Sequence, residues 1–100
     1  MNASPPYQQN AYSRYNRLKK RFPPLIRKKL SEAEDQIAAN PSIGEEKSGD
    51  LKGIRVYKFK VFDQEILLAY QVDKYKKEVI FAAAGGHENF YRDLKGYLIV

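Results

Sequence analysis

Residues 54–72 read IRVYKFKVFDQEILLAYQV, and this stretch decides the fold. It contains two runs, residues 54–61 and 65–72, that are rich in β-branched and aromatic side chains. Such side chains favour the pleated, half-buried surface of a β-sheet. Asp63 and Gln64, which separate the runs, fit a tight turn, so the stretch predicts a β-hairpin.

A third strand is predicted over residues 77–84, after a turn at residues 73–76, which makes an antiparallel meander. Because successive side chains of a strand alternate between faces, Lys58 and Lys60 share one face, and Tyr57 and Phe59 lie on the other. Residues 65–72 are apolar on both faces, which is typical of a central strand. We expect helices to cover the aromatic face and to leave the lysine face open.

Two amphipathic helices are predicted ahead of the sheet. The first is expected over residues 7–21, and the second runs from Pro24 to the break at Asn40-Pro41. In each, apolar residues recur on one helical face. These residues are Ala11, Tyr15, Leu18 and Phe22 in the first helix and Ile26, Leu30, Ala33 and Ile37 in the second.

The remaining segments complete one domain over residues 1–100. Residues 1–6 read as an irregular arm, residues 42–52 as a polar loop, and residues 88–96 as a short helix. Helices followed by strands predict an α+β fold. We expect an N-terminal helical hairpin packed on a small antiparallel β-sheet of three to four strands, with a short C-terminal helix.

The charge and composition narrow the classes of function. The net charge is +6, and residues 1–40 carry eight Lys or Arg against three acids, which suits a phosphate backbone or an acidic protein partner. The chain has no cysteine and one histidine, which excludes disulfides and argues against a zinc site. No apolar run is long enough to span a bilayer, so a cytoplasmic location without a membrane partner is expected.

A second informative stretch is GGHENFYRDL at residues 85–94. Two glycines end the third strand there, and a short helix follows. The stretch holds the only histidine, His87, together with Tyr91 and Arg92. Histidine changes its charge near neutral pH, so His87 is the first candidate for a general acid or base.

With these pieces in order, the sequence resembles the RelE/ParE superfamily of type II bacterial toxins. The resemblance covers about residues 7–97 and rests on the order and spacing of four segments. The segments are Asn40-Pro41 with Gly44, GDLKGIRVYK at residues 49–58, LAYQV at residues 68–72 and HENFYRDL at residues 87–94.

The resemblance implies a small basic toxin that is paired with a cognate antitoxin protein. Its RelE-like branch cleaves mRNA on the ribosome without metal or cofactor, whereas its ParE-like branch inhibits DNA gyrase. A remnant that only binds the antitoxin is the third alternative. The chain departs from the family at two places: residues 1–6 make a poor N-terminal strand, and Leu67 stands where the RelE-like branch commonly has an arginine.

The resemblance also implies roles for individual residues in RNA cleavage. Lys58 and Lys60 match the lysine pair of the RelE-like branch and would hold the phosphate. His87 would transfer protons, Tyr91 would stack on a base or orient the 2′-hydroxyl, and Arg92 would clamp the phosphate. Further contacts to RNA, ribosomal RNA included, would come from Arg55, Lys52, Arg14, Arg17, Lys19, Lys20, Arg21, Arg27, Lys28 and Lys29.

Alternatives stay open for several of these residues. Simple alternation puts Arg55 on the opposite face from the strand lysines, which could merely solvate an open face. His87 could be a structural cap, Tyr91 could be a core aromatic, and Arg92 could pair with Glu88. The carboxylates that could serve as the base are Glu65, Glu45 and Glu46.

Overall fold

The centre of the molecule is an antiparallel meander, in a computed structural model that describes residues 5–88 and 90–98. The three strands are β3 (Arg55–Val61), β4 (Gln64–Asp73) and β5 (Glu78–Gly85). The predicted hairpin and third strand are therefore confirmed. The turn between β3 and β4 lies one residue earlier than predicted, at Phe62 and Asp63, and β4 is the central strand, as its two apolar faces indicated.

Two short strands extend this meander at its edges, so the sheet has five strands in the order β1-β5-β4-β3-β2. β1 (Gln8–Ala11) pairs with β5 in parallel, and β2 (Glu45–Glu46) pairs with β3 in antiparallel orientation. The α+β class is confirmed, but the expected three to four strands were too few. The predicted polar loop at residues 42–52 also contains a turn of 3-10 helix, η1 (Gly49–Leu51).

The prediction of one helix over residues 7–21 is wrong in its first half, because α1 (Ser13–Lys20) begins only after β1. The four-residue step from Ala11 to Tyr15 looks like one helical turn in the sequence. In the structure, Ala11 instead lies in register with Phe81 of β5, and Tyr12 N–H donates to the Phe81 carbonyl at 3.1 Å. The edge of β5 thus supplies partners that sequence periodicity does not reveal, and an N-terminal strand is present. Residues 1–4 of the predicted arm lie outside the described residues.

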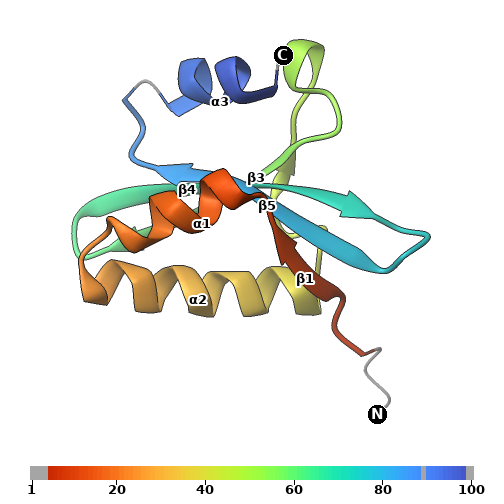
Figure 1. Cartoon of the computed structure of the whole chain (residues 1–100), viewed down its shortest axis with the longest axis horizontal. Coiled ribbons are helices and arrows are strands. Elements are labelled where there is room, and N and C mark those ends of the chain that lie inside the picture. Colours follow the sequence, from red (N-terminus) through yellow and green to blue (C-terminus); the bar gives the residue numbers. More distant parts are fainter. Residues whose placement is uncertain (1–4, 89, 99–100) are drawn as a thin grey trace.

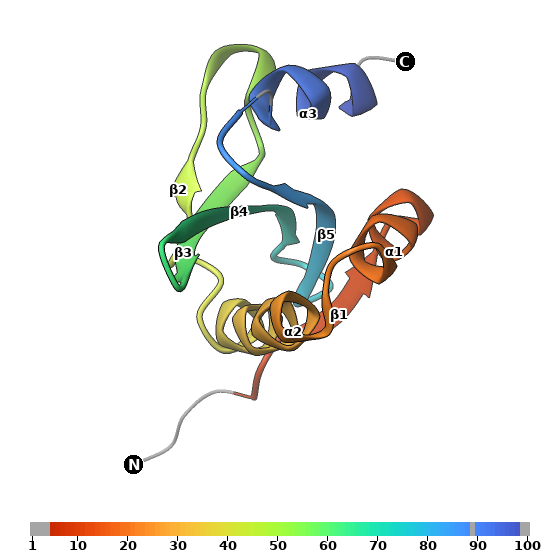
Figure 2. The same ribbon diagram turned by 90° about the vertical axis from the view of Figure 1, so that its left-hand side faces the viewer.

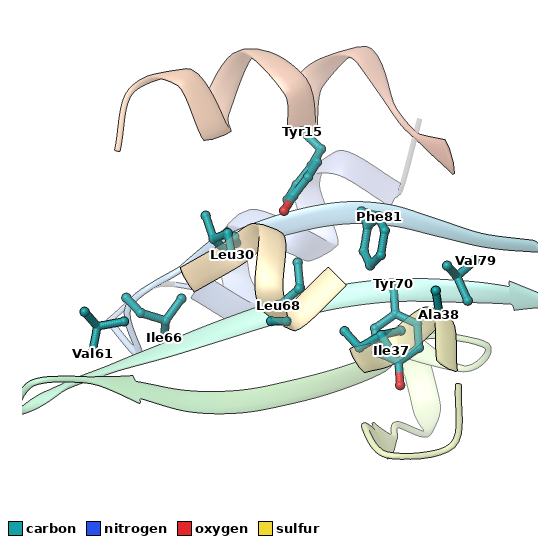
Figure 3. Close-up of a cluster of buried hydrophobic side chains, with 12 residues drawn as sticks. Tyr15, Leu30, Ile37, Ala38, Val61, Ile66, Leu68, Tyr70, Val79 and Phe81 are labelled. Atoms are coloured by element: carbon teal, nitrogen blue, oxygen red, sulfur yellow. The ribbon is translucent and has the colours of Figure 1, made fainter. Parts of the chain in front are cut away.

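The two helices α1 and α2 (Pro24–Ala39) cover one face of the sheet, as Figure 1 and Figure 2 show. α2 ends immediately before Asn40-Pro41, as predicted. Figure 3 shows the core between the layers, where apolar side chains of both helices meet those of β4 and β5. Its largest buried members are Tyr15, Leu30, Ile37, Leu68, Tyr70 and Phe81.

Tyr70 connects this core to the loop after α2. Its hydroxyl donates to the Pro41 carbonyl at 2.7 Å and accepts from Gly44 N–H at 2.9 Å. A Cβ at Gly44 would lie 2.5 Å from that hydroxyl oxygen, so only glycine fits. The loop is therefore fixed beside β3, where β2 can pair.

The C-terminal helix α3 (Phe90–Leu98) packs on the other face of the sheet and begins two residues later than predicted (Figure 1). Its Phe90 and Leu94 join a second buried cluster that contains Val56, Leu67 and Ala69. Lys58 and Lys60 remain exposed on the same face. Within the two described segments, no helix is long and apolar enough to cross a membrane.

Candidate functional site

A β-bulge in β5 determines which face the end of this strand approaches. The register between β4 and β5 skips Ala82. An extra residue shifts the alternation of side chains by one position. Before the bulge, Phe81 faces α1 and α2; after it, Gly85 pairs with Leu67, which belongs to the cluster beneath α3. The chain that leaves β5 therefore emerges on the lysine face.

His87 meets Glu65 at this end of the sheet. His87 Nε2 lies 2.5 Å from Glu65 Oε1, and the two side chains are 55% and 34% exposed. Glu65 lies in register with Lys60 across β3 and β4. A carboxylate at this distance fixes the orientation of an imidazole. The structure thus brings a proton-transfer group, a carboxylate and a lysine onto one exposed face.

Lys58 lies two residues before Lys60 on β3, and both side chains are exposed. A carboxylate approaches Lys58 from β2: Glu45 lies in register with Val56, which shares the face of Lys58. Lys47 and, to a smaller extent, Lys58 hold the pKa of Glu45 below its ordinary value, through a hydrogen bond from Lys47 and the positive charge of both lysines. The site therefore continues from Lys60 along β3 towards β2.

Tyr91 lies at the β2 end of the site, next to Lys47. Lys47 was not among the site residues predicted from the sequence. The Lys47 ammonium lies 5.3 Å from the centre of the Tyr91 ring and also contacts the Glu45 carboxylate. The hydrogen bond that Lys47 donates to Glu45 raises the pKa of Lys47, burial opposes that effect, and Tyr91 adds to it. Tyr91 is half-buried and packs edge-on against Phe90. Lys47 gave no signal in the sequence, because only pairing of β2 with β3 brings it here.

Three other predicted site residues, Arg55, Lys52 and Arg92, have different surroundings. Arg55 is on the opposite face, as alternation indicated, and its guanidinium donates to the Gly44 carbonyl at 2.6 Å. Lys52 is exposed in the loop before β3. Arg92 is exposed on α3 with its Nε 3.9 Å from Asp93, and no contact with Glu88 is recorded among the described residues. Of these three, Arg55 is the residue that the structure places away from the lysine face.

The other predicted cations lie on or next to α1 and α2, which cover the face of the sheet opposite to α3 (Figure 2). Several have partners within the helical layer. Lys19 contacts Glu34 at 3.0 Å and donates to the Ser31 hydroxyl at 2.8 Å, and Lys29 lies 3.5 Å from Glu32. The other members of this surface are Arg14, Arg17, Lys20, Arg21, Arg27 and Lys28. Lys29 lines one pocket together with Lys60, so the helical cations reach the edge of the lysine face at β3.

No candidate metal site formed by three or more His, Cys, Asp or Glu occurs in the part of the chain that the structure describes. The polar groups of the candidate site are one imidazole, two carboxylates and three ammonium groups, from His87, Glu65, Glu45, Lys58, Lys60 and Lys47. Groups of these kinds are able to transfer protons and to bind anions.

The architecture is that of RelE toxins, which defines the class by fold. The toxin–antitoxin complex RelBE2 from Mycobacterium tuberculosis matches with a TM-score of 0.73 and 18% identity, over 82% of this chain and 92% of that chain. A mutant of the E. coli toxin RelE in the free state matches with a TM-score of 0.72 and 19% identity, over 95% and 99%. The archaeal RelE–RelB complex from Pyrococcus horikoshii OT3 matches with a TM-score of 0.59 and 16% identity, over 82% and 96%.

The family follows from the sequence itself. Residues 9–95 match the family model of the ParE-like toxin of type II bacterial toxin–antitoxin systems, and the chain belongs to this family. A search of curated protein sequences found no significant match. The predicted membership of the RelE/ParE superfamily is therefore confirmed.

Proposed function

We propose that this toxin is a metal-free endoribonuclease that cleaves mRNA on the ribosome. The observation that carries the proposal is the contact between His87 and Glu65 beside Lys58 and Lys60, on one exposed face of the sheet. The fold shared with RelE toxins supports the choice but does not carry it, because one fold can host several functions.

The mechanism follows from the groups on that face. The Nε2 atom of His87 is held towards Glu65, so the other ring nitrogen is available to accept the proton of a ribose 2′-hydroxyl. The 2′-oxygen then attacks the phosphorus, and Glu65 stabilises the resulting imidazolium. Lys60, which lies beside Glu65, stabilises the charge that grows on the phosphate oxygens, and Lys58 holds the RNA backbone next to it. The bond to the 5′-oxygen breaks, the leaving oxygen takes a proton from water, and the His87 imidazolium returns its proton to the hydroxide that this leaves, so that a 2′,3′-cyclic phosphate and a 5′-hydroxyl remain.

Mapping of mRNA ends on translating ribosomes tests this proposal. We expect the purified toxin to cut, and His87→Ala to lower the cleavage rate by roughly 100- to 10,000-fold, the usual contribution of a general acid or base. Glu65→Gln should lower it less, because the amide still accepts a hydrogen bond but cannot balance an imidazolium charge.

The matched control is Lys76→Ala, which removes an exposed lysine at the β4–β5 turn, at the other end of the sheet from His87. It should cut as fast as the parent, whereas Lys58→Ala should not. Intact mRNA after incubation with a folded, toxic parent protein would exclude the nuclease.

One observation favours a second function, inhibition of DNA gyrase without nuclease activity. The central-strand position where the resemblance implies an arginine is occupied by Leu67, which is fully buried beneath α3. The matching family is also named after ParE. A gyrase supercoiling assay decides the matter: loss of supercoiling that persists in His87→Ala would replace the nuclease proposal. Absence of toxicity in cells would instead leave only antitoxin binding.

We propose a cognate antitoxin as the protein partner. The M. tuberculosis and E. coli relatives were solved as toxin–antitoxin complexes, and a net charge of +6 suits an acidic partner. We expect the antitoxin to cover the open face. Co-expression with the adjacent reading frame should yield a complex that does not cleave mRNA, and a complex that still cleaves would contradict occlusion of this face.

A further inference from the structure

The Glu45 carboxylate lies between two cations on the open face. Glu45 is in register with Val56, so its side chain points to the same face as Lys58. Its carboxylate contacts the Lys47 ammonium, and both lysines lower its pKa. The side chain is nevertheless 71% exposed. An exposed ion pair contributes little to stability and exchanges readily with other ions.

Lys47 is held far more firmly than its partner. Its side chain is only 19% exposed, and its ammonium packs over the Tyr91 ring. Its backbone N–H donates to the Ile54 carbonyl at 2.9 Å, which extends the pairing of β2 with β3. The cation is thus positioned by α3 and the sheet before any ligand arrives, whereas the Glu45 carboxylate can rotate into solvent.

Two regularly spaced lysines of β3 connect this cluster with the proposed cleavage centre. Lys58 and Lys60 are alternate residues of β3, so their attachment points are separated by roughly 7 Å along the strand. That separation is comparable to the distance between neighbouring phosphates in an extended single strand. Lys60 lies beside Glu65, which contacts His87, and Lys58 lies near Glu45, whose carboxylate contacts Lys47.

We propose that Lys47 and Lys58 form a phosphate-binding subsite for the RNA phosphodiester next to the scissile one, and that Glu45 occupies it in the free protein. Tyr91, whose ring lies under the Lys47 ammonium, forms the apolar wall of this subsite. RNA displaces the Glu45 carboxylate from the subsite, while the backbone of Glu45 stays paired in β2. The inference rests on the proposed function for the identity of the ligand, and it adds Lys47 as a binding residue and Glu45 as a competing anion.

Binding of an uncleavable RNA, with 2′-O-methyl groups throughout, tests the subsite separately from catalysis. Fluorescence anisotropy should show that Glu45→Gln binds this RNA about two- to fivefold more tightly than the parent. The reason is that the carboxylate of an exposed ion pair no longer competes with the RNA phosphate for the two lysines. Lys47→Met should bind about tenfold more weakly and should reduce the salt dependence by about one phosphate contact. Lys47→Arg should restore binding, since the guanidinium keeps the charge.

Glu46→Gln is the matched control, because Glu46 is the neighbour of Glu45 on β2 and lies in register with Arg55 on the opposite face. It removes the same charge from the chain but not from the subsite, so its affinity should equal that of the parent. Thermal unfolding of each variant separates a loss of binding from a loss of packing around α3.

The outcomes distinguish the two proposals. Unchanged or weaker binding by Glu45→Gln overturns the subsite, and a loss of cleavage by Glu45→Gln with unchanged affinity would instead make Glu45 the general base. If the affinities follow the expected order but the parent leaves ribosome-bound mRNA intact, the nuclease proposal fails and the RNA subsite stands. If the parent cuts mRNA and Lys47→Met binds like the parent, only the subsite fails.

Discussion

Polar groups are buried with partners on one face of the sheet and exposed to solvent on the other. On the face covered by α1 and α2, buried hydroxyls have partners inside the protein: Tyr15 donates to Glu34 at 2.5 Å, and Tyr70 bonds to Pro41 and Gly44. On the open face, His87, Glu65 and the strand lysines stay accessible to solvent. Buried polar groups with partners give stability, and exposed groups are available to a ligand. Substitutions on the two faces should therefore have separable effects.

The largest expected effect on stability comes from the helix-covered core. Leu68→Ala removes a fully buried side chain of β4 and should lower the free energy of unfolding by about 2–5 kcal/mol. Urea denaturation measures this change. The comparison variant is Lys58→Ala on β3, which should stay within about 0.5 kcal/mol of the parent because the side chain is exposed. A Lys58→Ala protein as unstable as Leu68→Ala would mean that the open face is structural.

A smaller loss is expected from Tyr70→Phe, which keeps the ring but removes the hydroxyl. Gly44 N–H then loses its acceptor in a buried position, so unfolding should become easier by about 1–3 kcal/mol. Hydrogen exchange should speed up at Gly44 more than in β4, since the loop after α2 loses its attachment. Retained protection at Gly44 would show that another group or water accepts its hydrogen.

These same residues show how far sequence reasoning reaches. β3, β4 and α2 were predictable because each carries its own periodicity, and alternation alone placed Lys58 with Lys60 and Arg55 opposite them. β1 was not predictable, since its partners lie on β5, some seventy residues away in sequence.

The candidate site was predictable only in part for the same physical reason. His87 could be singled out by its residue type, but its contact with Glu65 depends on the bulge at Ala82, which a strict two-residue period does not contain. Lys47 reaches Tyr91 only through the two-residue strand β2. Contacts that depend on register between distant segments leave no local signal.

The pH dependence of stability should also differ between the faces. Burial, followed by the charge of Glu34 and the hydrogen bond to it, raises the pKa of Tyr15 above its ordinary value. The contribution of Tyr15 to the free energy of unfolding is therefore complete below about pH 10, where this tyrosine is neutral in the unfolded chain. It falls by about 1.4 kcal/mol per pH unit above that pH.

Tyr15→Phe measures this contribution. At neutral pH the variant should be about 1 kcal/mol less stable than the parent, through loss of the hydrogen bond to Glu34. Above pH 10 this difference should shrink and then reverse, because phenylalanine does not ionise. The difference between Leu68→Ala and the parent should stay constant over the same range. A constant Tyr15→Phe difference would show that the hydroxyl ionises as easily in the folded protein as in the unfolded one.

The smallest expected effect concerns the helical cations. Lys29 and Glu32 are 3.5 Å apart, and both side chains are exposed to solvent. Such a pair contributes about 0.5 kcal/mol or less, so Lys29→Ala should leave urea denaturation almost unchanged. It should also leave cleavage of a short RNA almost unchanged, because Lys29 is paired with Glu32 and its pocket includes neither His87 nor Glu65. If Lys29→Ala weakens association with ribosomes while short-RNA cleavage is intact, the helical surface binds ribosomal RNA independently. The two faces would then differ in the ligands that they bind, and the contrast between a face for stability and a face for function would not hold.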